Sequence, residues 1–156
     1  RGLGDVYKRQ EQNRTTTQKL WQALYLRDWD GVGALFAEDG LYQDVPTPDF
    51  GAVGPAAIAR RLRIGHEPVE RHEHHIERIV AEGNCVVTEH REDWYFHTGE
   101  VVKLPFTSIH EYNDKGEITL WRDYWDLSTL MNNAPAWWLE QIMAADGDEF
   151  GSAETD

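Results

Sequence analysis

Two short segments carry ionisable side chains inside stretches that otherwise resemble core β-strands. They are Arg91-Glu92-Asp93 and Trp121–Asp126. Successive side chains of a strand point to opposite faces, so the outer two residues of the first segment share one face. In the second segment, Asp123 shares a face with the tryptophans two residues to either side. A carboxylate between two indoles is expected at the edge of an apolar cavity, where an unpaired charge is costly to bury. Together the segments favour acid–base chemistry in a cavity over two solvated surface ion pairs.

Composition limits the class of protein. The 156 residues fit one domain that is large enough to build a core without disulfides. The net charge of −13 disfavours a nucleic-acid partner, because such proteins concentrate positive charge. Cys85 is the only cysteine, which favours a reducing compartment. The sequence has no apolar run of membrane-spanning length and no signal-peptide pattern, so we expect a soluble, cytoplasmic protein without a membrane partner.

A histidine-rich segment at residues 71–75 invites comparison with metal sites. His72 and His74 would share a strand face, but a metal site needs three or four convergent ligands, and no third ligand follows at a recognisable spacing. We therefore expect a solvated strand and neither a metal nor a cofactor. Nucleophilic-hydrolase and phosphate-loop motifs are also missing, which disfavours covalent catalysis. The remaining candidates for chemistry are three carboxylates, an arginine and a tyrosine: Asp44, Asp93, Asp123, Arg91 and Tyr42.

Predicted helices precede predicted strands along the chain. Residues 1–14 lack periodicity and resemble a translated adapter, so we expect a non-native or disordered leader. Leu20, Trp21, Leu24 and Tyr25 then repeat at helical spacing. The elements predicted further along are a short helix after residue 30, a strand at 40–45, a helix at 56–64, strands at 71–81, 85–97, 101–112 and 117–126, and a helix from 127 to 143.

This order predicts one α+β domain over residues 15–145. Its helices should pack on one face of a curved antiparallel sheet, since hairpin connections separate the long strands. The tail at 146–156 is acidic and contains Gly and Ser, so we expect it to be disordered.

Three segments in sequence order resemble the signatures of the limonene-1,2-epoxide hydrolase family. They are residues 42–46 (Tyr-Gln-Asp-Val-Pro), Arg91-Glu92-Asp93 and Trp121–Asp126. The resemblance implies a cone-shaped α+β barrel of the nuclear transport factor 2-like (cystatin-like) superfamily. SnoaL-type polyketide cyclases, ketosteroid isomerases and many binding proteins share that fold, and a fold alone does not settle function.

Carried over to this chain, the resemblance implies a role for each matching residue. Asp93 would be the general acid that protonates an epoxide oxygen, and Asp123 the general base that takes a proton from water. Arg91 would bridge the two carboxylates, and Tyr42 would help to hold the water. The implied reaction is one-step, cofactor-independent hydrolysis of a small or medium apolar epoxide to a diol. A homodimer is also expected by resemblance.

Asp44 is a departure from the family, which usually has asparagine at this position. An ionised carboxylate only accepts hydrogen bonds, whereas an amide also donates. If Asp44 faces the same cavity, three carboxylates meet one arginine, and at least one more proton should be retained unless Asp44 reaches solvent or Arg122. Asp44 would then share the base role, take it over, or mark the loss of epoxide chemistry.

Aromatic residues are expected to line the pocket: Trp121, Trp125, Trp94 and Phe106. Two alternatives to the hydrolase stay open. One is a polyketide cyclase or ketosteroid-isomerase-like enzyme, which needs a single base, and the other is a non-catalytic small-molecule binding protein. Trp137 and Trp138 suit a dimer contact, core packing or a pocket lid equally.

Overall fold

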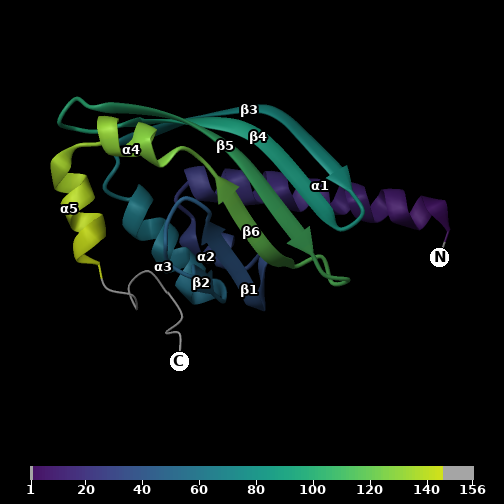
Figure 1. The fold of residues 1–156 in the computed structure, drawn as a ribbon. Coiled ribbons are helices and arrows are strands. Elements are labelled where there is room, and N and C mark those ends of the chain that lie inside the picture. Colours follow the sequence, from purple (N-terminus) through teal and green to yellow (C-terminus); the bar gives the residue numbers. More distant parts are fainter. Residues whose placement is uncertain (1, 146–156) are drawn as a thin grey trace.

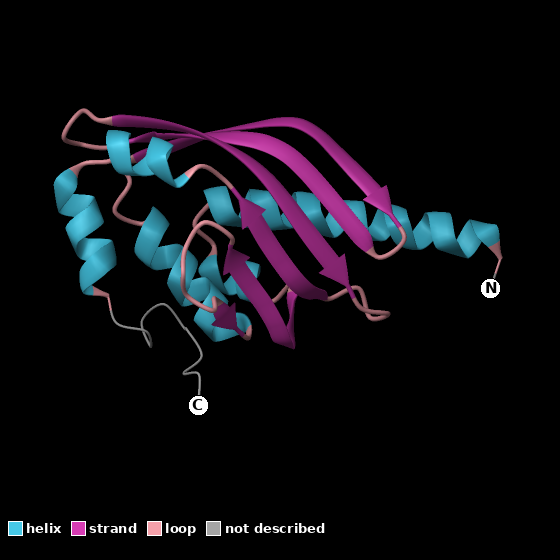
Figure 2. Ribbon diagram, in the orientation of Figure 1, coloured by secondary structure: helices cyan, strands magenta, loops and turns pink. Residues whose placement is uncertain are grey.

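The computed structural model describes residues 2–145, and its helices lie against the concave face of one curved sheet (Figures 1 and 2). The tail predicted to be disordered lies outside the described residues. The elements are α1 (Leu3–Tyr25), α2 (Trp29–Gly33), β1 (Phe36–Asp44), β2 (Ala52–Val53), α3 (Pro55–His66), β3 (Arg71–Glu82), β4 (Cys85–Tyr95), β5 (Val101–Tyr112), β6 (Ile118–Tyr124), α4 (Leu127–Asn133) and α5 (Ala136–Ala144).

The sheet has the strand order β2-β1-β6-β5-β4-β3. The expected α+β class and curved sheet are confirmed, although the sheet stays open instead of closing into a barrel. Its neighbouring strands are antiparallel except β1 and β6, which run parallel. That parallel pair sets Tyr42 beside Trp121 and Asp44 beside Asp123, so residues 79 positions apart meet at one end of the sheet.

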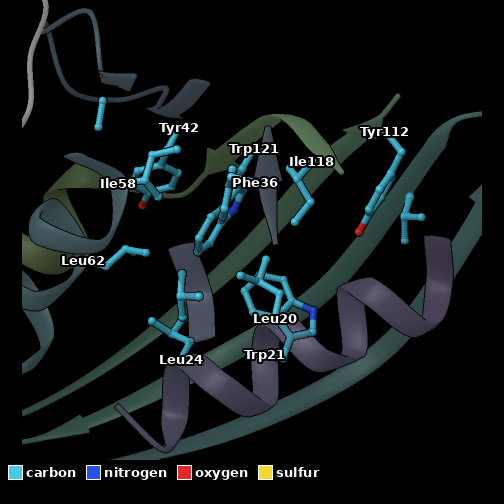
Figure 3. Packing of buried hydrophobic residues seen from close by; sticks show 13 residues of the cluster. Leu20, Trp21, Leu24, Phe36, Tyr42, Ile58, Leu62, Tyr112, Ile118 and Trp121 are labelled. Atoms are coloured by element: carbon cyan, nitrogen blue, oxygen red, sulfur yellow. The ribbon is translucent and has the colours of Figure 1, made fainter. Parts of the chain in front are cut away.

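The first helix uses one apolar stripe to cover the sheet. Leu20, Trp21 and Leu24 are almost fully buried, and they project from α1 toward Phe36 and Trp121 (Figure 3). Their spacing of three and four residues places them on one helix face, as the sequence predicts. The indole of Trp21 meets that of Trp121 edge to face, with ring centroids 5.5 Å apart.

The leader is helical from Leu3 and not disordered, because α1 begins there and not near residue 15. Most side chains before Asn13 are exposed, so the first turns have no core-facing stripe and give no periodic signal. Tertiary contacts hold this part of the helix: Arg9 bonds Asp114 at 2.9 Å, and Arg14 bonds the Ile79 carbonyl at 2.6 Å.

The C-terminal helix predicted from residue 127 to 143 is divided in two. Pro135 forces the residue before it out of the helical region, and Ala134 is extended, with φ −73° and ψ 147°. The break lets α5 turn and pack Trp138 against Trp94 and Phe96. Among the described residues, no helix is long and apolar enough to cross a membrane.

Candidate active site

A pocket with about 360 Å³ of empty space, part of it open to solvent, lies under the concave face of the sheet, where two apolar clusters meet. Its polar wall holds Tyr42, Asp44, Glu92 and Asp123, while most of the remaining wall is aliphatic or aromatic. The four aromatic residues expected to line the pocket all do so: Trp121, Trp125, Trp94 and Phe106. Their contact with a substrate stays a prediction.

Asp123 reaches the cavity from β6 and is 4% exposed. Its Oδ1 accepts hydrogen bonds from the Ser108 hydroxyl and the Trp121 indole, both at 2.5 Å. Burial raises the pKa of Asp123 well above its usual value, and the nearby carboxylate of Asp44 raises it further, against the effect of the two donors. Asp123 therefore retains a proton under conditions where an exposed aspartate is ionised.

Tyr42 connects Asp123 to Asp44. Its hydroxyl donates to Asp44 Oδ1 at 2.9 Å and lies 3.3 Å from Asp123 Oδ2. Burial and these two carboxyl groups raise the pKa of Tyr42, so the phenol keeps its proton. One phenolic proton cannot serve both contacts equally, and a proton on Asp123 Oδ2 satisfies the longer one.

Asp44 does face the cavity, and its charge is balanced by Arg61 of α3. Arg61 Nη2 lies 3.2 Å from Asp44 Oδ2, and Nη1 bonds Asp49 at 2.6 Å. The Trp125 indole also donates to Asp44 at 3.0 Å. The alternative partner Arg122 bonds Gln43 instead. The predicted group of three carboxylates around Arg91 therefore does not form, and the arginine that pairs with Asp44 is Arg61.

A chain of hydrogen bonds runs from His74 on β3 across the sheet to Asp123. Nε2 of His74 lies 2.9 Å from Nδ1 of His90, and Nε2 of His90 lies 2.7 Å from the Ser108 hydroxyl. Burial lowers the pKa of His74 and of His90 to about 4, so both rings are neutral near pH 7. Because the Ser108 hydroxyl donates to Asp123, the Ser108 oxygen accepts from His90. Each group in this hydrogen-bond chain therefore donates to the next.

Glu92 is the second buried carboxylate of the cavity wall. The Tyr25 hydroxyl donates to Oε1, and the Trp94 indole donates to Oε2 at 2.6 Å. Burial raises the pKa of Glu92, but the imidazole of His66 outweighs that effect and the pKa lies below its usual range. An anion that accepts on both oxygens fits these donors better than a protonated carboxyl group does.

Arg91 and Asp93 do not join this group, which corrects their predicted position. On β4 the buried residues His90, Glu92 and Trp94 alternate with them and take the concave face. Arg91 and Asp93 lie on the opposite face, where they bond one another at 2.8 Å and His75 lies 3.2 Å from Asp93. Since successive strand residues point to opposite faces, Asp93 and Trp94 cannot line one cavity.

Sequence reasoning missed five residues of the site, namely Glu92, His90, Ser108, Arg61 and His66. The alternation of β4 was the available signal for the first two, because Val86, Thr88 and Trp94 share their face. Ser108 and Arg61 carried no pattern of their own.

A second hollow, of about 840 Å³, adjoins the first on the side of α4 and α5. The two share Tyr42, Leu62, His66, Trp94, Trp125 and Leu130. Trp138 lines this outer hollow and donates its indole proton to the Gly65 carbonyl at 3.0 Å. Trp138 therefore serves as core packing and pocket wall, whereas Trp137 bonds Thr98 at 2.9 Å.

Comparison with known proteins agrees with this fold. A family model described as a SnoaL-like domain matches residues 17–121, and the chain belongs to that family, part of the nuclear transport factor 2-like superfamily. Epoxide hydrolase EphG of Mycobacterium tuberculosis (strain ATCC 25618 / H37Rv) is 35% identical over 108 residues, which are 67% of each chain. The chain is therefore a homologue of an epoxide hydrolase.

Solved structures extend the comparison. An M. tuberculosis LEH-like epoxide hydrolase superimposes with a TM-score of 0.67 at 27% identity, over 86% of this chain and 95% of the other. A Delta 5-3-ketosteroid isomerase from Mycobacterium sp. superimposes with a TM-score of 0.63 at 23% identity, over 74% and 93% of the two chains. The second likeness establishes the shared fold alone.

Proposed function

We propose that the protein is a cofactor-independent epoxide hydrolase that adds water to a small or medium apolar epoxide in one step. The observation that carries the proposal is the convergence of Tyr42, Asp44, Glu92 and Asp123 on one cavity with apolar walls. Hydrolysis needs a proton donor for the epoxide oxygen and a proton acceptor for water. Two carboxyl groups whose surroundings push their pKa values apart supply both.

Asp123 is the proton donor in this proposal, a reversal of the base role that the resemblance implies. Its burial and the charge of Asp44 favour the protonated form. Ser108 and Trp121 both donate to Oδ1, so that oxygen has the carbonyl character and Oδ2 carries the proton. The donor oxygen is then the one beside the Tyr42 hydroxyl.

Glu92 is the proposed base. It replaces Asp93 as the second carboxyl group of the acid–base pair, and the role of general acid passes to Asp123. The two oxygens of Glu92 each accept one hydrogen bond and can accept further ones, and the residue lines the cavity. Asp44 is a poorer base, because Tyr42, Trp125 and Arg61 already occupy its oxygens. In the reaction, water adds to an epoxide carbon and loses its proton to Glu92, while the C–O bond breaks and the oxygen takes the proton of Asp123.

The resemblance implies that Arg91 bridges the two carboxyl groups, but Arg91 lies on the other face of the sheet. His90 takes over the bridging role in this proposal. It lies two residues before Glu92 on the same strand face and reaches Asp123 through Ser108. The neutral imidazole orients Asp123 without adding a charge, whereas an arginine would favour the ionised acid. This difference supports Asp123 as the proton donor.

Limonene oxide and cyclohexene oxide are the substrates that test the proposal. The purified protein is incubated with each, and the vicinal diol is measured by gas chromatography against a reaction without protein. We expect diol from at least one of them, since the aromatic walls suit a compact hydrocarbon ring. No diol across a broad panel of epoxides would contradict the hydrolase.

The pH–rate profile should respond to Asp44. Because the charge of Asp44 helps to raise the pKa of Asp123, Asp44→Asn should lower that pKa and move the alkaline limb of kcat/KM to lower pH. Asp49→Asn is the matched control, since Asp49 also bonds Arg61 but is not among the groups that shift Asp123. An alkaline limb that moves equally in both variants, or in neither, would argue against Asp123 as the acid.

An isomerase is the second candidate, favoured by the contact between Tyr42 and the protonated Asp123. In that reaction the protonated Asp123 donates to the oxygen of an enolate, while Glu92 removes the proton alpha to a carbonyl. The steroid 5-androstene-3,17-dione separates the candidates: a rise in conjugated-enone absorbance without diol from any epoxide favours the isomerase. A homodimer and a cytoplasmic location remain part of the proposal, and light scattering of the purified chain tests the former.

A further inference from the structure

Three ionisable side chains from different elements converge beside the cavity. His66 ends α3, His72 lies on β3 and Glu92 on β4. One nitrogen or oxygen atom from each lies within 4.8 Å of the other two. Nε2 of His66 is 3.7 Å from Oε2 of Glu92, which is too long for a hydrogen bond. Both imidazole Nε2 atoms are buried, and neither has a hydrogen-bond partner among the described residues.

The tautomer of His66 makes this arrangement informative. Its Nδ1 lies 3.0 Å from the Leu62 carbonyl, which can only accept, so Nδ1 carries the proton. Nε2 is then the atom of the ring that is left to act as a ligand, and it lies toward a carboxylate oxygen of Glu92. A buried polar atom without a partner is costly, and two of them beside one carboxylate indicate an occupant that would bond to all three.

We propose that His66, His72 and Glu92 form a binding site for a divalent first-row transition metal such as Zn²⁺. Two histidines and a glutamate are a known protein ligand set for this ion. Ligand atoms bound at about 2.0–2.2 Å to one tetrahedral ion lie about 3.4 Å apart, close to the 3.7 Å between His66 and Glu92. His66 and Glu92 both line the cavity, so an ion bound between them would be reached from it.

Further contacts orient the ligands, as metal sites require. Tyr25 and Trp94 each donate to one oxygen of Glu92, and the Leu62 carbonyl fixes the ring of His66. The rings of His66 and His72 stack with centroids 5.0 Å apart, which restricts both. The cavity gives the ion a path to the site.

A second group of potential ligands, Glu73, His75 and Asp93, lies on the outer face of the sheet and fits a cation less well. Arg91 bonds Asp93 at 2.8 Å, and Arg71 bonds Glu73, so two positive charges already occupy these carboxylates. A divalent cation could bind these carboxylates only by displacing both arginines. The outer group therefore serves as the internal comparison for the proposed site.

The proposed metal shares Glu92 with the proposed hydrolytic pair. A bound Zn²⁺ would engage the carboxylate that accepts the proton from water, and so would inhibit hydrolysis. That consequence rests on the proposed function, whereas the binding itself does not.

Calorimetric titration of the full chain with ZnCl₂, after treatment with EDTA and without any epoxide, tests the site. We expect one ion bound per chain and a rise in Tm. His72→Leu should weaken binding by at least about 100-fold, since it removes a ligand outright. His75→Leu changes the same strand on its other face and should leave the affinity unchanged.

The comparison of the two variants decides the proposal. Absence of Zn²⁺ binding to the native chain would overturn it, and so would equal weakening by both variants or loss of binding with His75→Leu alone. If His72→Leu does not fold, as judged by circular dichroism, Tyr25→Phe replaces it and should weaken binding about 10–100-fold by releasing Glu92. Unchanged affinity in that variant would also count against the site. Because no epoxide is present, a failed hydrolase assay does not affect these results.

Discussion

Glu92→Gln should lower kcat for epoxide hydrolysis by about 10²–10⁴-fold, while Asp93→Asn should leave it near the native value. The two residues are neighbours, and both variants replace a carboxylate by the amide of the same size. Glu92 lines the cavity, whereas Asp93 lies on the opposite face with Arg91 and His75. Only the first substitution removes a group that can accept the proton from water.

Steady-state rates of diol formation, measured with EDTA present, check this pair of variants. Circular dichroism and Tm show whether each variant is folded, because Glu92 accepts hydrogen bonds from Tyr25 and Trp94 that the amide only partly replaces. A large loss of activity in Asp93→Asn with little change in Glu92→Gln would return the role to Asp93. Such a result would require β4 to present its other face to the cavity.

The disagreement over β4 has a simple geometric cause. The motif Arg-x-Asp matches residues 91–93 by residue type, and this match places both side chains in the cavity. A shift of one residue along a strand sends every side chain to the other face. The chain has His90 and Glu92 in the cavity register, where the resemblance implies arginine and aspartate. The buried Trp94, two residues further along, already fixes that register.

Other parts of the site depend on contacts that no local pattern encodes. Arg61 is one of several charged residues on α3, and its contact with Asp44 arises only when α3 lies across the open end of the sheet. The parallel pairing of β1 with β6 is also a long-range event, and it brings Asp44 and Asp123 side by side. By contrast, the helix stripe at Leu20 to Leu24 and the long strands follow local periodicity, so the fold class was predictable from the sequence.

Arg61→Met should lower the free energy of unfolding by about 3–5 kcal/mol, the second large effect that we expect. The Arg61 side chain is 7% exposed, and its guanidinium contacts two carboxylates, Asp44 at 3.2 Å and Asp49 at 2.6 Å. Burial lowers the pKa of Arg61, but the two aspartates outweigh it and hold the guanidinium fully protonated. Removing this charge leaves Asp44, whose side chain is 15% exposed, as an uncompensated anion beside Tyr42 and Asp123.

A double-mutant cycle separates the charge effect from lost packing. Asp44→Asn removes the anion, so the double variant with Arg61→Met should recover part of the stability that Arg61→Met alone loses. Urea denaturation of the four proteins at pH 7 gives the coupling energy, and Asp49→Asn in place of Asp44→Asn is the control, since the Asp49 side chain is 34% exposed. Recovery by Asp44→Asn that exceeds recovery by Asp49→Asn is the expected order. Additive losses with no recovery would mean that Arg61 stabilises the fold by packing, and that the charge of Asp44 in the cavity is balanced without it.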